Sequence, residues 1–459
     1  MISRKKKIIA LTVIFFAVLI FAGAGCPDIG KPDPINPKPV SLQWWGVWNE
    51  SNQVAPLIAA YQASHQYVRI SYKKFRFEEF ETKLTEALAE DRGPDIISIN
   101  NTWVRRYQSK ISPMPNKPLS VAIGKAQKKG PSTEIVYTQV AAPILSAKAI
   151  KDKFVPVVYG DVMVDGKIYG LPLSLDSLVL IYNRGILAQA KITKTPSTWQ
   201  EVLNASRLVT LQDKDGKLTR SSAALGTANN VPRFFDVLSL LMMQSGAQMT
   251  DRLGKAASFH LAPGLASGSP PAVGALEFYT NFANPNKESY TWNASQPNAV
   301  EAFASGQLAM MFGYAYHLPQ LKAKAPGLDI GIVPMPQLDP INEINYANYW
   351  VEAPLKKTKY PNEAWDFILF AAGNEKAAST YADKTGRPPA LRSLIDKYRE
   401  DPEKGVFALS ALTAQNWYHG RNPAAAEDIF KEMINRVLDG TSPIQDALNS
   451  AAQRVNQTF

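Results

Sequence analysis

The feature that most constrains the fold is a regular alternation of short apolar runs with amphipathic segments, which begins near residue 40. Residues 40–48 are rich in aromatic and apolar side chains and predict a strand. Residues 54–63 carry apolar side chains at helical spacing, residues 67–72 alternate as a strand does, and residues 77–90 are again amphipathic. A buried strand follows at residues 95–99. Strands and helices that alternate at this spacing predict an α/β fold with parallel-rich sheets flanked by helices.

The length and composition predict more than one domain. About 420 residues follow residue 40, and 46% of the chain is hydrophobic, which is enough for two compact cores. No period of 20 to 50 residues recurs, so a repeat protein is not indicated. Residues 111–160 break the alternation because they are rich in Pro, Lys and Ser. We interpret them as an irregular excursion from the first domain, with a helical patch near residues 140–151.

The first forty residues have the pattern of an export signal followed by a tether. Four basic residues at positions 4–7 precede an apolar stretch at residues 8–24, which predicts a signal peptide over residues 1–25. Cys26, the only cysteine, follows small residues as in a bacterial lipobox, although Gly23 stands where that pattern has Leu. The resemblance implies that Cys26 is lipidated and anchors the chain to the outer face of the cell membrane. Residues 26–40 are Pro-rich and predict an extended tether.

The charge balance does not call for a nucleic-acid partner. The formal net charge is +10, and about +6 remains once the four basic residues of the leader are removed. Scattered solvated lysines account for a charge of this size. With a single cysteine and no metal-ligand spacing among the four histidines, we expect no disulfide, metal site or cofactor.

Several strings occur in an order typical of one protein family. They are Arg-Gly-Pro-Asp-Ile-Ile from Arg92, Asp-Gly-Lys-Ile-Tyr-Gly-Leu-Pro from Asp165, Leu-Ile-Tyr-Asn-Arg from Leu180, Pro-Ser-Thr-Trp from Pro196, Ala-Phe-Ala-Ser-Gly-Gln-Leu-Ala-Met-Met from Ala302, and Gly-Arg-Pro-Pro-Ala from Gly386. From about Leu42 to the C-terminus the chain resembles the family 1 extracellular solute-binding proteins, the sugar-binding components of ABC-type importers and the family of maltose-binding protein. Residues 111–160 match this pattern least well.

The resemblance implies a two-lobed periplasmic-binding-protein fold of the class II type, whose lobes close on a ligand by hinge motion. We place lobe one at residues 41–174 plus 348–395, and lobe two at residues 175–347 plus 396–459. It also implies a monomer that captures a mono- or oligosaccharide and delivers it to ABC permease subunits served by a separate ATPase. An open parallel sheet offers a crevice at the carboxyl ends of its strands, and two facing crevices form a cleft.

A sugar presents hydroxyl groups around its ring edge and an apolar C–H face, so its site needs aromatic platforms beside carboxylate, amide and guanidinium groups. Residues of these types follow the predicted strands of lobe one, namely Trp45, Trp48, Asn49, Glu50, Asn100, Asn101 and Trp103. Asp176 lies in an apolar run where an unpaired carboxylate would be costly, and the family places a ligand-binding acid at the matching position. The resemblance and the local pattern add further candidates: Asn229, Asn230, Trp292, Tyr314, Tyr316, Trp350, Arg387 and Trp417.

Other classes of function stay open at this point. The sequence has no HExxH motif, Gly-x-Ser-x-Gly elbow or phosphate loop, and we expect no catalysis. A glycosidase needs only two carboxylates across a bond, and acidic residues are abundant. A binder of peptides or polyamines could share the two-lobed fold, as could a surface receptor without transport.

Overall fold

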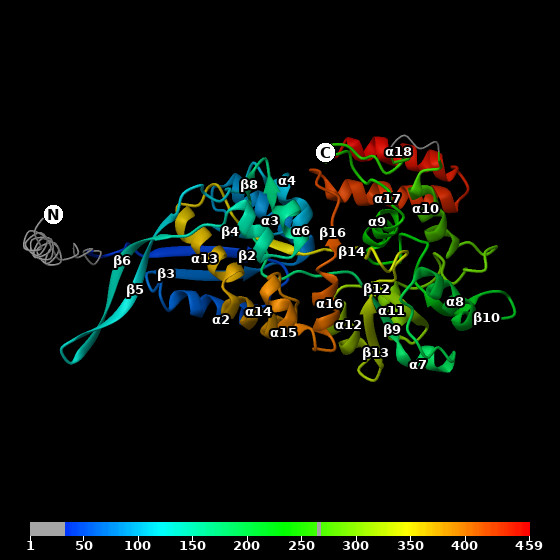
Figure 1. Ribbon diagram of the computed structural model, residues 1–459, viewed down its shortest axis with the longest axis horizontal. Helices are drawn as coiled ribbons and strands as arrows, with labels where there is room; N and C mark the ends of the chain where they lie inside the picture. The colour runs from blue at the N-terminus through cyan, green and yellow to red at the C-terminus, as the bar shows by residue number, and fades with distance from the viewer. Residues whose placement is uncertain (1–32, 264–267) are drawn as a thin grey trace, which may run out of the picture.

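The computed structural model describes residues 33–263 and 268–459. The predicted signal peptide, Cys26 and the first part of the tether lie outside these residues. The chain forms two lobes at opposite ends of a long axis, and segments from both meet at the middle (Figure 1). None of the helices in the described residues is both long and apolar enough to cross a membrane.

The sheet of lobe one has four strands in the order β15-β4-β2-β3. They are β2 (Val40–Gly46), β3 (Val68–Lys74), β4 (Ile96–Asn100) and β15 (Trp350–Pro354). Strand β2 pairs in parallel with β3 and β4, whereas β15 runs antiparallel to β4. The helical segments of this lobe are α2 (Ser51–Gln62), α3 (Phe77–Ala89), η1 (Asn101–Trp103), α4 (Val104–Tyr107), α5 (Ala147–Lys153), α6 (Pro156–Val162), α13 (Pro361–Gly373), α14 (Glu375–Thr385) and α15 (Arg392–Tyr398).

The sheet of lobe two has five strands in the order β10-β11-β12-β9-β13. They are β9 (Val179–Asn183), β10 (Leu211–Gln212), β11 (Leu218–Ala223), β12 (Leu308–Gly313) and β13 (Ile330–Pro334). The helices are α7 (Arg184–Gln189), α8 (Trp199–Val209), α9 (Phe234–Gln244), α10 (Pro271–Asn281), α11 (Ala299–Ala304), α12 (His317–Lys324), α16 (Lys404–Ser410), α17 (Pro423–Leu438) and α18 (Ile444–Asn456). The remaining strands form two short pairs and a three-stranded sheet that is described below. The pairs are β7 (Met163–Val164) with β8 (Lys167–Ile168), and β14 (Asn345–Tyr346) with β16 (Ala414–Gln415).

The α/β fold is confirmed, but the second sheet is less parallel than the sequence pattern suggests. Only β11 and β12 pair in parallel there, while β9 runs antiparallel to both of its neighbours. Strand β9 is the first strand after the chain leaves lobe one, and β15 is the first strand after it returns. Each sheet therefore contains one strand that the chain forms directly after crossing from the other lobe. This strand runs antiparallel to the strands beside it.

Each lobe has its own apolar core. Leu42, Trp44 and Leu175 pack in the core of lobe one, whereas Leu178 and Leu180 belong to that of lobe two. The chain therefore changes core within three residues of Leu175. It changes back close to Ala347, where Tyr346 packs with lobe two and Ala347 with lobe one. These extended crossings join the lobes and border the space between them.

Residues 111–160 are more regular than the sequence predicts. Strands β5 (Leu119–Lys129) and β6 (Ser132–Ala142) form a long antiparallel hairpin, and the expected helical patch begins only at α5. Gly130, with φ 64°, occupies the left-handed conformation in the tight turn. Strand β1 (Pro34–Ile35) pairs with β6, so part of the predicted tether is docked on this hairpin. The lysine-rich second half of β5 hides the strand signal because it lacks apolar alternation.

Candidate functional site

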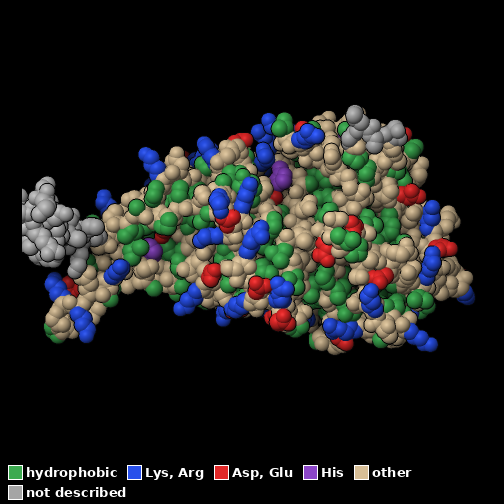
Figure 2. All heavy atoms as spheres, in the orientation of Figure 1, with side chains coloured by type: hydrophobic (Ala, Val, Ile, Leu, Met, Phe, Trp, Pro, Cys, Tyr) green, Lys and Arg blue, Asp and Glu red, His purple; other side chains and the backbone are tan. Residues whose placement is uncertain are grey.

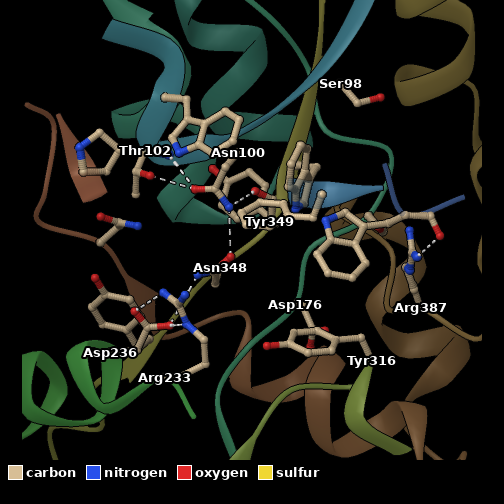
Figure 3. A pocket seen from close by; sticks show the side chains of 18 of the residues that line it. Ser98, Asn100, Thr102, Asp176, Arg233, Asp236, Tyr316, Asn348, Tyr349 and Arg387 are labelled. Atoms are coloured by element: carbon tan, nitrogen blue, oxygen red, sulfur yellow. Dashed lines mark hydrogen bonds and ion pairs between the residues drawn. The ribbon is translucent and has the colours of Figure 1, made fainter. Parts of the chain in front are cut away.

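A cavity of about 420 Å³ lies between the two lobes. Its walls come from the ends of β2, β4 and β15, from both crossing segments, and from the starts of α9 and α17 (Figure 3). Eight of the residues predicted from the sequence line it: Trp48, Asn49, Asn100, Trp103, Asp176, Tyr316, Trp350 and Arg387. The carboxyl ends of parallel strands meet at one edge of a sheet, which explains why residues distant in the sequence converge here.

Aromatic rings form one wall of the cavity. Trp350 packs edge-to-face against Trp48 and Trp103, with ring centroids 6.1 and 5.6 Å apart. Phe77 stacks on Trp48 at 6.1 Å. On the other side of the cleft, Tyr316 of lobe two stacks on Trp48 with centroids 5.6 Å apart and planes inclined by 25°. Trp48 and Phe77 keep 37% and 45% of their surface exposed, so part of each aromatic side chain remains accessible to a ligand.

Amide groups line the wall at the end of β4. The Asn100 side chain donates to the Asn348 Oδ1 at 3.0 Å and accepts from the Thr102 backbone amide and hydroxyl at 3.1 and 2.8 Å. Asn348 lies on the crossing segment, and its amide also donates to Asp236 at 3.3 Å. These contacts fix the orientation of both amides, as Figure 3 shows. A preorganised amide loses little entropy when it binds a hydroxyl group.

Asp176 and Arg387 bring charged groups to the cavity. The Asp176 carboxylate accepts from the Ala315 backbone amide at 3.1 Å. Burial raises the pKa of Asp176 to about 7, although backbone amides and Arg387 oppose that rise. The Arg387 guanidinium donates to Asn49 Oδ1 at 2.8 Å and to the Trp48 carbonyl at 3.0 Å. It therefore holds the loop that carries Trp48 in place.

A second charged group lies at the start of α9. The Arg233 guanidinium donates two hydrogen bonds of 2.8 Å to the Asp236 carboxylate and one of 3.2 Å to Glu427. Asp236 is 1% exposed and also accepts from the Tyr314 hydroxyl at 2.7 Å. All of these groups except Tyr314 line the cavity. The guanidinium offsets one of the two negative charges that the acids would otherwise present to a ligand.

Four other predicted residues, three in lobe one and one in the loop before α11, do not line the cavity. They lie in a core or at the surface instead. Trp45 is 8% exposed and packs on Phe75, because it points to the opposite face of β2 from the cavity. Glu50 lies at the start of α2 and pairs with Lys74 at the surface. Asn101 is buried and donates to Asp161 at 2.8 Å. Trp292 is fully buried in lobe two.

The remaining four predicted residues of lobe two also lie off the cavity wall. Asn229 is exposed, and Asn230 holds the loop before α11 by donating to two backbone carbonyls at 2.8 and 2.9 Å. Tyr314 is buried one layer behind the wall, where it donates to Asp236. Trp417 packs on Phe235 in the core, while its neighbours Asn416 and Tyr418 line the cavity.

Other wall residues were not predicted from the sequence. The main ones are Phe77, Ser98, Thr102, Arg233, Asp236, Tyr346, Asn348, Tyr349, Glu352, Tyr381 and Glu427. Glu352 carries the same signal that singled out Asp176, an acid within an apolar run. In the described residues, no group of three or more His, Cys, Asp or Glu side chains is placed to hold a metal ion.

The buried carboxyl of Glu352 predicts a pH dependence of stability. It accepts from Ser98 at 2.5 Å and Trp44 at 2.8 Å, yet burial raises its pKa from 4.5 to about 7. A raised pKa favours the protonated folded state, so this contribution is complete below pH 4.5 and is lost as the pH rises to about 7. We expect Glu352→Gln to gain about 2 to 3 kcal/mol relative to the unsubstituted chain between pH 4.5 and 7.5. Urea unfolding at a series of pH values measures this difference, and a difference independent of pH would contradict the assignment.

Comparison with known proteins identifies a family and relatives of this chain. Residues 56–406 match the family described as bacterial extracellular solute-binding protein. The chain is similar to the diacetylchitobiose binding protein DasA of Streptomyces coelicolor, with 22% identity over 83% of this chain and 80% of that protein. It is also similar to the multiple sugar-binding protein of Streptococcus mutans, with 22% identity over 62% of this chain and 66% of that protein.

A solved structure supports the fold independently. The cyclic α-maltosyl-1,6-maltose binding protein from Arthrobacter globiformis superimposes with a TM-score of 0.72 at 18% identity, covering 92% of this chain and 99% of that one. The relatives are binding proteins rather than enzymes. The match to the family spans most of the chain and includes both crossing segments. The chain therefore belongs to the bacterial extracellular solute-binding proteins, a family that works outside the cytoplasm.

Proposed function

We propose that the protein captures a neutral mono- or oligosaccharide between its lobes and delivers it, chemically unchanged, to an ABC-type permease. The observation that carries this proposal is the pairing of an aromatic wall with fixed amide, carboxylate and guanidinium groups around one cavity. A sugar ring needs both, because its faces are apolar and its edge carries hydroxyl groups. The named relatives bind diacetylchitobiose and multiple sugars, which supports the same ligand class.

The charges of the cavity favour a neutral ligand over a polyamine or a charged peptide. Asp236 and Glu427 are paired with Arg233. The positive charge of Arg387 lowers the pKa of both Asp176 and Glu352, against the larger rise that burial causes. A polycation would have to displace these guanidinium groups or leave them facing a like charge, and either outcome costs free energy. Hydroxyl groups can bond to the free edges of the same side chains without breaking the pairs.

The contacts of the carboxyl groups also favour binding over hydrolysis. Glu352 is held by Ser98 and Trp44, and Asp236 by Arg233 and Tyr314. A glycosidase needs one carboxyl group free to donate a proton and a second one free to attack or to activate water.

We further propose that the carrier is a monomer anchored by a lipid on Cys26, and that its lobes close around the ligand.

The proposal predicts a fluorescence response to sugars. Trp48, Trp103 and Trp350 line the cavity, so a ligand that displaces water from their rings should change tryptophan emission. We expect saturable titration with at least one member of a panel of glucose, maltose, maltotriose, cellobiose and diacetylchitobiose. Chromatography of the recovered sugar should show no cleavage. A panel without response, alongside a response to peptides or spermidine, would sink the carbohydrate proposal.

A further inference from the structure

The β5–β6 hairpin extends well beyond the core of lobe one. Its base is fixed, because Val121 and Ala122 are buried and the Gly124 amide donates to the Ser64 carbonyl at 2.8 Å. From Lys125 onward every residue of β5 is exposed, as are residues 130–135 around the turn. The hairpin projects from the end of the molecule that lies farthest from lobe two (Figure 1). A projection of this kind contributes nothing to the ligand cavity.

The exposed part of the hairpin is basic. It carries Lys125, Lys128 and Lys129 against a single acid, Glu134, which pairs with Lys129 at 3.2 Å. Basic side chains lie at its tip in Figure 2. The lysines occupy both faces of the hairpin, because Lys128 points opposite to Lys125 and Lys129 in the strand alternation. Ile135, 36% exposed, lies among them. The tip thus combines positive charge with a small apolar surface.

The N-terminal segment is docked on the same hairpin. Pro34 and Ile35 pair with Thr138 and Tyr137 of β6, and Ile35 packs against the core of lobe one. Pro34 lies eight positions after Cys26, and the chain from one to the other spans at most about 28 Å when fully extended. The seven residues of β6 from Thr138 back to its start at Ser132 cover about 20 Å. The reach of the tether and the reach of the hairpin are therefore comparable.

We propose that the β5–β6 hairpin rests on an anionic bilayer surface, where Lys125, Lys128 and Lys129 contact lipid phosphate groups. This inference rests on the lipid anchor at Cys26 in the proposed function. The length of the chain between Cys26 and Pro34 keeps the bilayer within about 28 Å of Pro34, close enough for the hairpin tip to meet it. Each lysine near an anionic surface adds to the electrostatic attraction. The contact orients lobe one relative to the membrane.

The single cysteine allows the anchor to be supplied chemically. The chain from Cys26 onward can be coupled through its only thiol to a maleimide phospholipid in vesicles, so the experiment does not depend on lipidation in cells. A photoreactive benzoylphenylalanine at Gln127, an exposed position in the tip, should form adducts with lipid in vesicles that contain phosphatidylglycerol. The same group at Lys214, exposed in the β10–β11 turn of lobe two, should form none. Absence of lipid adducts at Gln127 in the coupled chain overturns the proposal.

Charge variants test the role of the lysines. The uncoupled Cys26→Ser chain should bind phosphatidylglycerol vesicles, and Lys125→Gln/Lys128→Gln/Lys129→Gln should weaken that binding by at least about tenfold. A matched set on lobe two, Lys214→Gln/Lys217→Gln/Lys287→Gln, removes the same charge and should have little effect. Equal loss in both sets, or equal adducts on phosphatidylcholine, overturns the electrostatic contact. Unaltered sugar titration in the hairpin variant shows that the chain is folded and separates this result from a failure of the proposed function.

Discussion

Replacing Trp48 with alanine is expected to weaken binding of the proposed sugar by about 30-fold or more. Trp48 lies at the centre of the aromatic wall, between Phe77 and Trp350 on its own lobe and Tyr316 on the other. Truncation of a tryptophan at the centre of a binding site typically costs at least about 2 kcal/mol, and about 1.4 kcal/mol corresponds to a factor of ten in affinity. The loss also removes the ring through which the aromatic wall of lobe one contacts Tyr316 of lobe two. Isothermal titration calorimetry measures the change without relying on tryptophan emission.

Two further variants make the result specific. Trp48→Phe keeps an aromatic face and should lose less affinity than Trp48→Ala. Leu211→Ala removes a large apolar side chain that is 48% exposed on lobe two, away from the cavity, and should leave affinity unchanged. Because Trp48 is itself 37% exposed, its removal should change the free energy of unfolding little. Unchanged affinity in Trp48→Ala would place the ligand elsewhere.

The order of strands and helices could be predicted from the sequence because each element carries its own local period. The strand at β2, the helix at α3 and the strand at β4 follow from apolar spacing alone. The β5–β6 hairpin could not be predicted in this way. Its outer half packs against nothing that is buried, so no apolar alternation is needed there, and its lysines suggested an irregular segment. The direction of β9 is likewise set by the passage of the chain between lobes, which no local pattern encodes.

The ligand site was predictable where a polar or aromatic residue directly follows a strand. Trp48 and Tyr316 follow β2 and β12, Asn100 is the last residue of β4, and all three line the cavity. The same rule does not resolve which of two neighbours faces the cavity, as Trp45 and Tyr314 show. Side chains that reach the cavity from the start of a helix carry no strand-end signal. Arg233 and Asp236 at the start of α9 were missed for this reason, although the Asp236 side chain is only 1% exposed.

The conformation and contacts of Arg233 make it a position where a substitution should strongly affect stability. Its backbone has φ 57°, the left-handed region that residues other than glycine seldom adopt. The guanidinium is fixed by two hydrogen bonds to Asp236 and one to Glu427, and its side chain is 26% exposed. The surrounding contacts must therefore stabilise a strained backbone. Asp236 depends on this partner, because burial leaves it almost no access to water.

Arg233→Met is expected to lower the free energy of unfolding of lobe two by about 3 kcal/mol, because it leaves the Asp236 charge buried without its cation. Methionine fills similar space and meets the same penalty at a positive φ, so the difference reports the lost ion pair. Arg184→Met is the matched control: Arg184 also pairs with an aspartate, Asp329, but the two side chains are 52% and 67% exposed, and the loss should stay under about 1 kcal/mol. Adding Asp236→Asn to Arg233→Met should recover part of the stability, since the orphaned charge is then removed. Urea unfolding followed by fluorescence and circular dichroism measures all four chains. Equal losses for Arg233→Met and Arg184→Met would show that the Arg233–Asp236 pair does not stabilise the wall of the cleft.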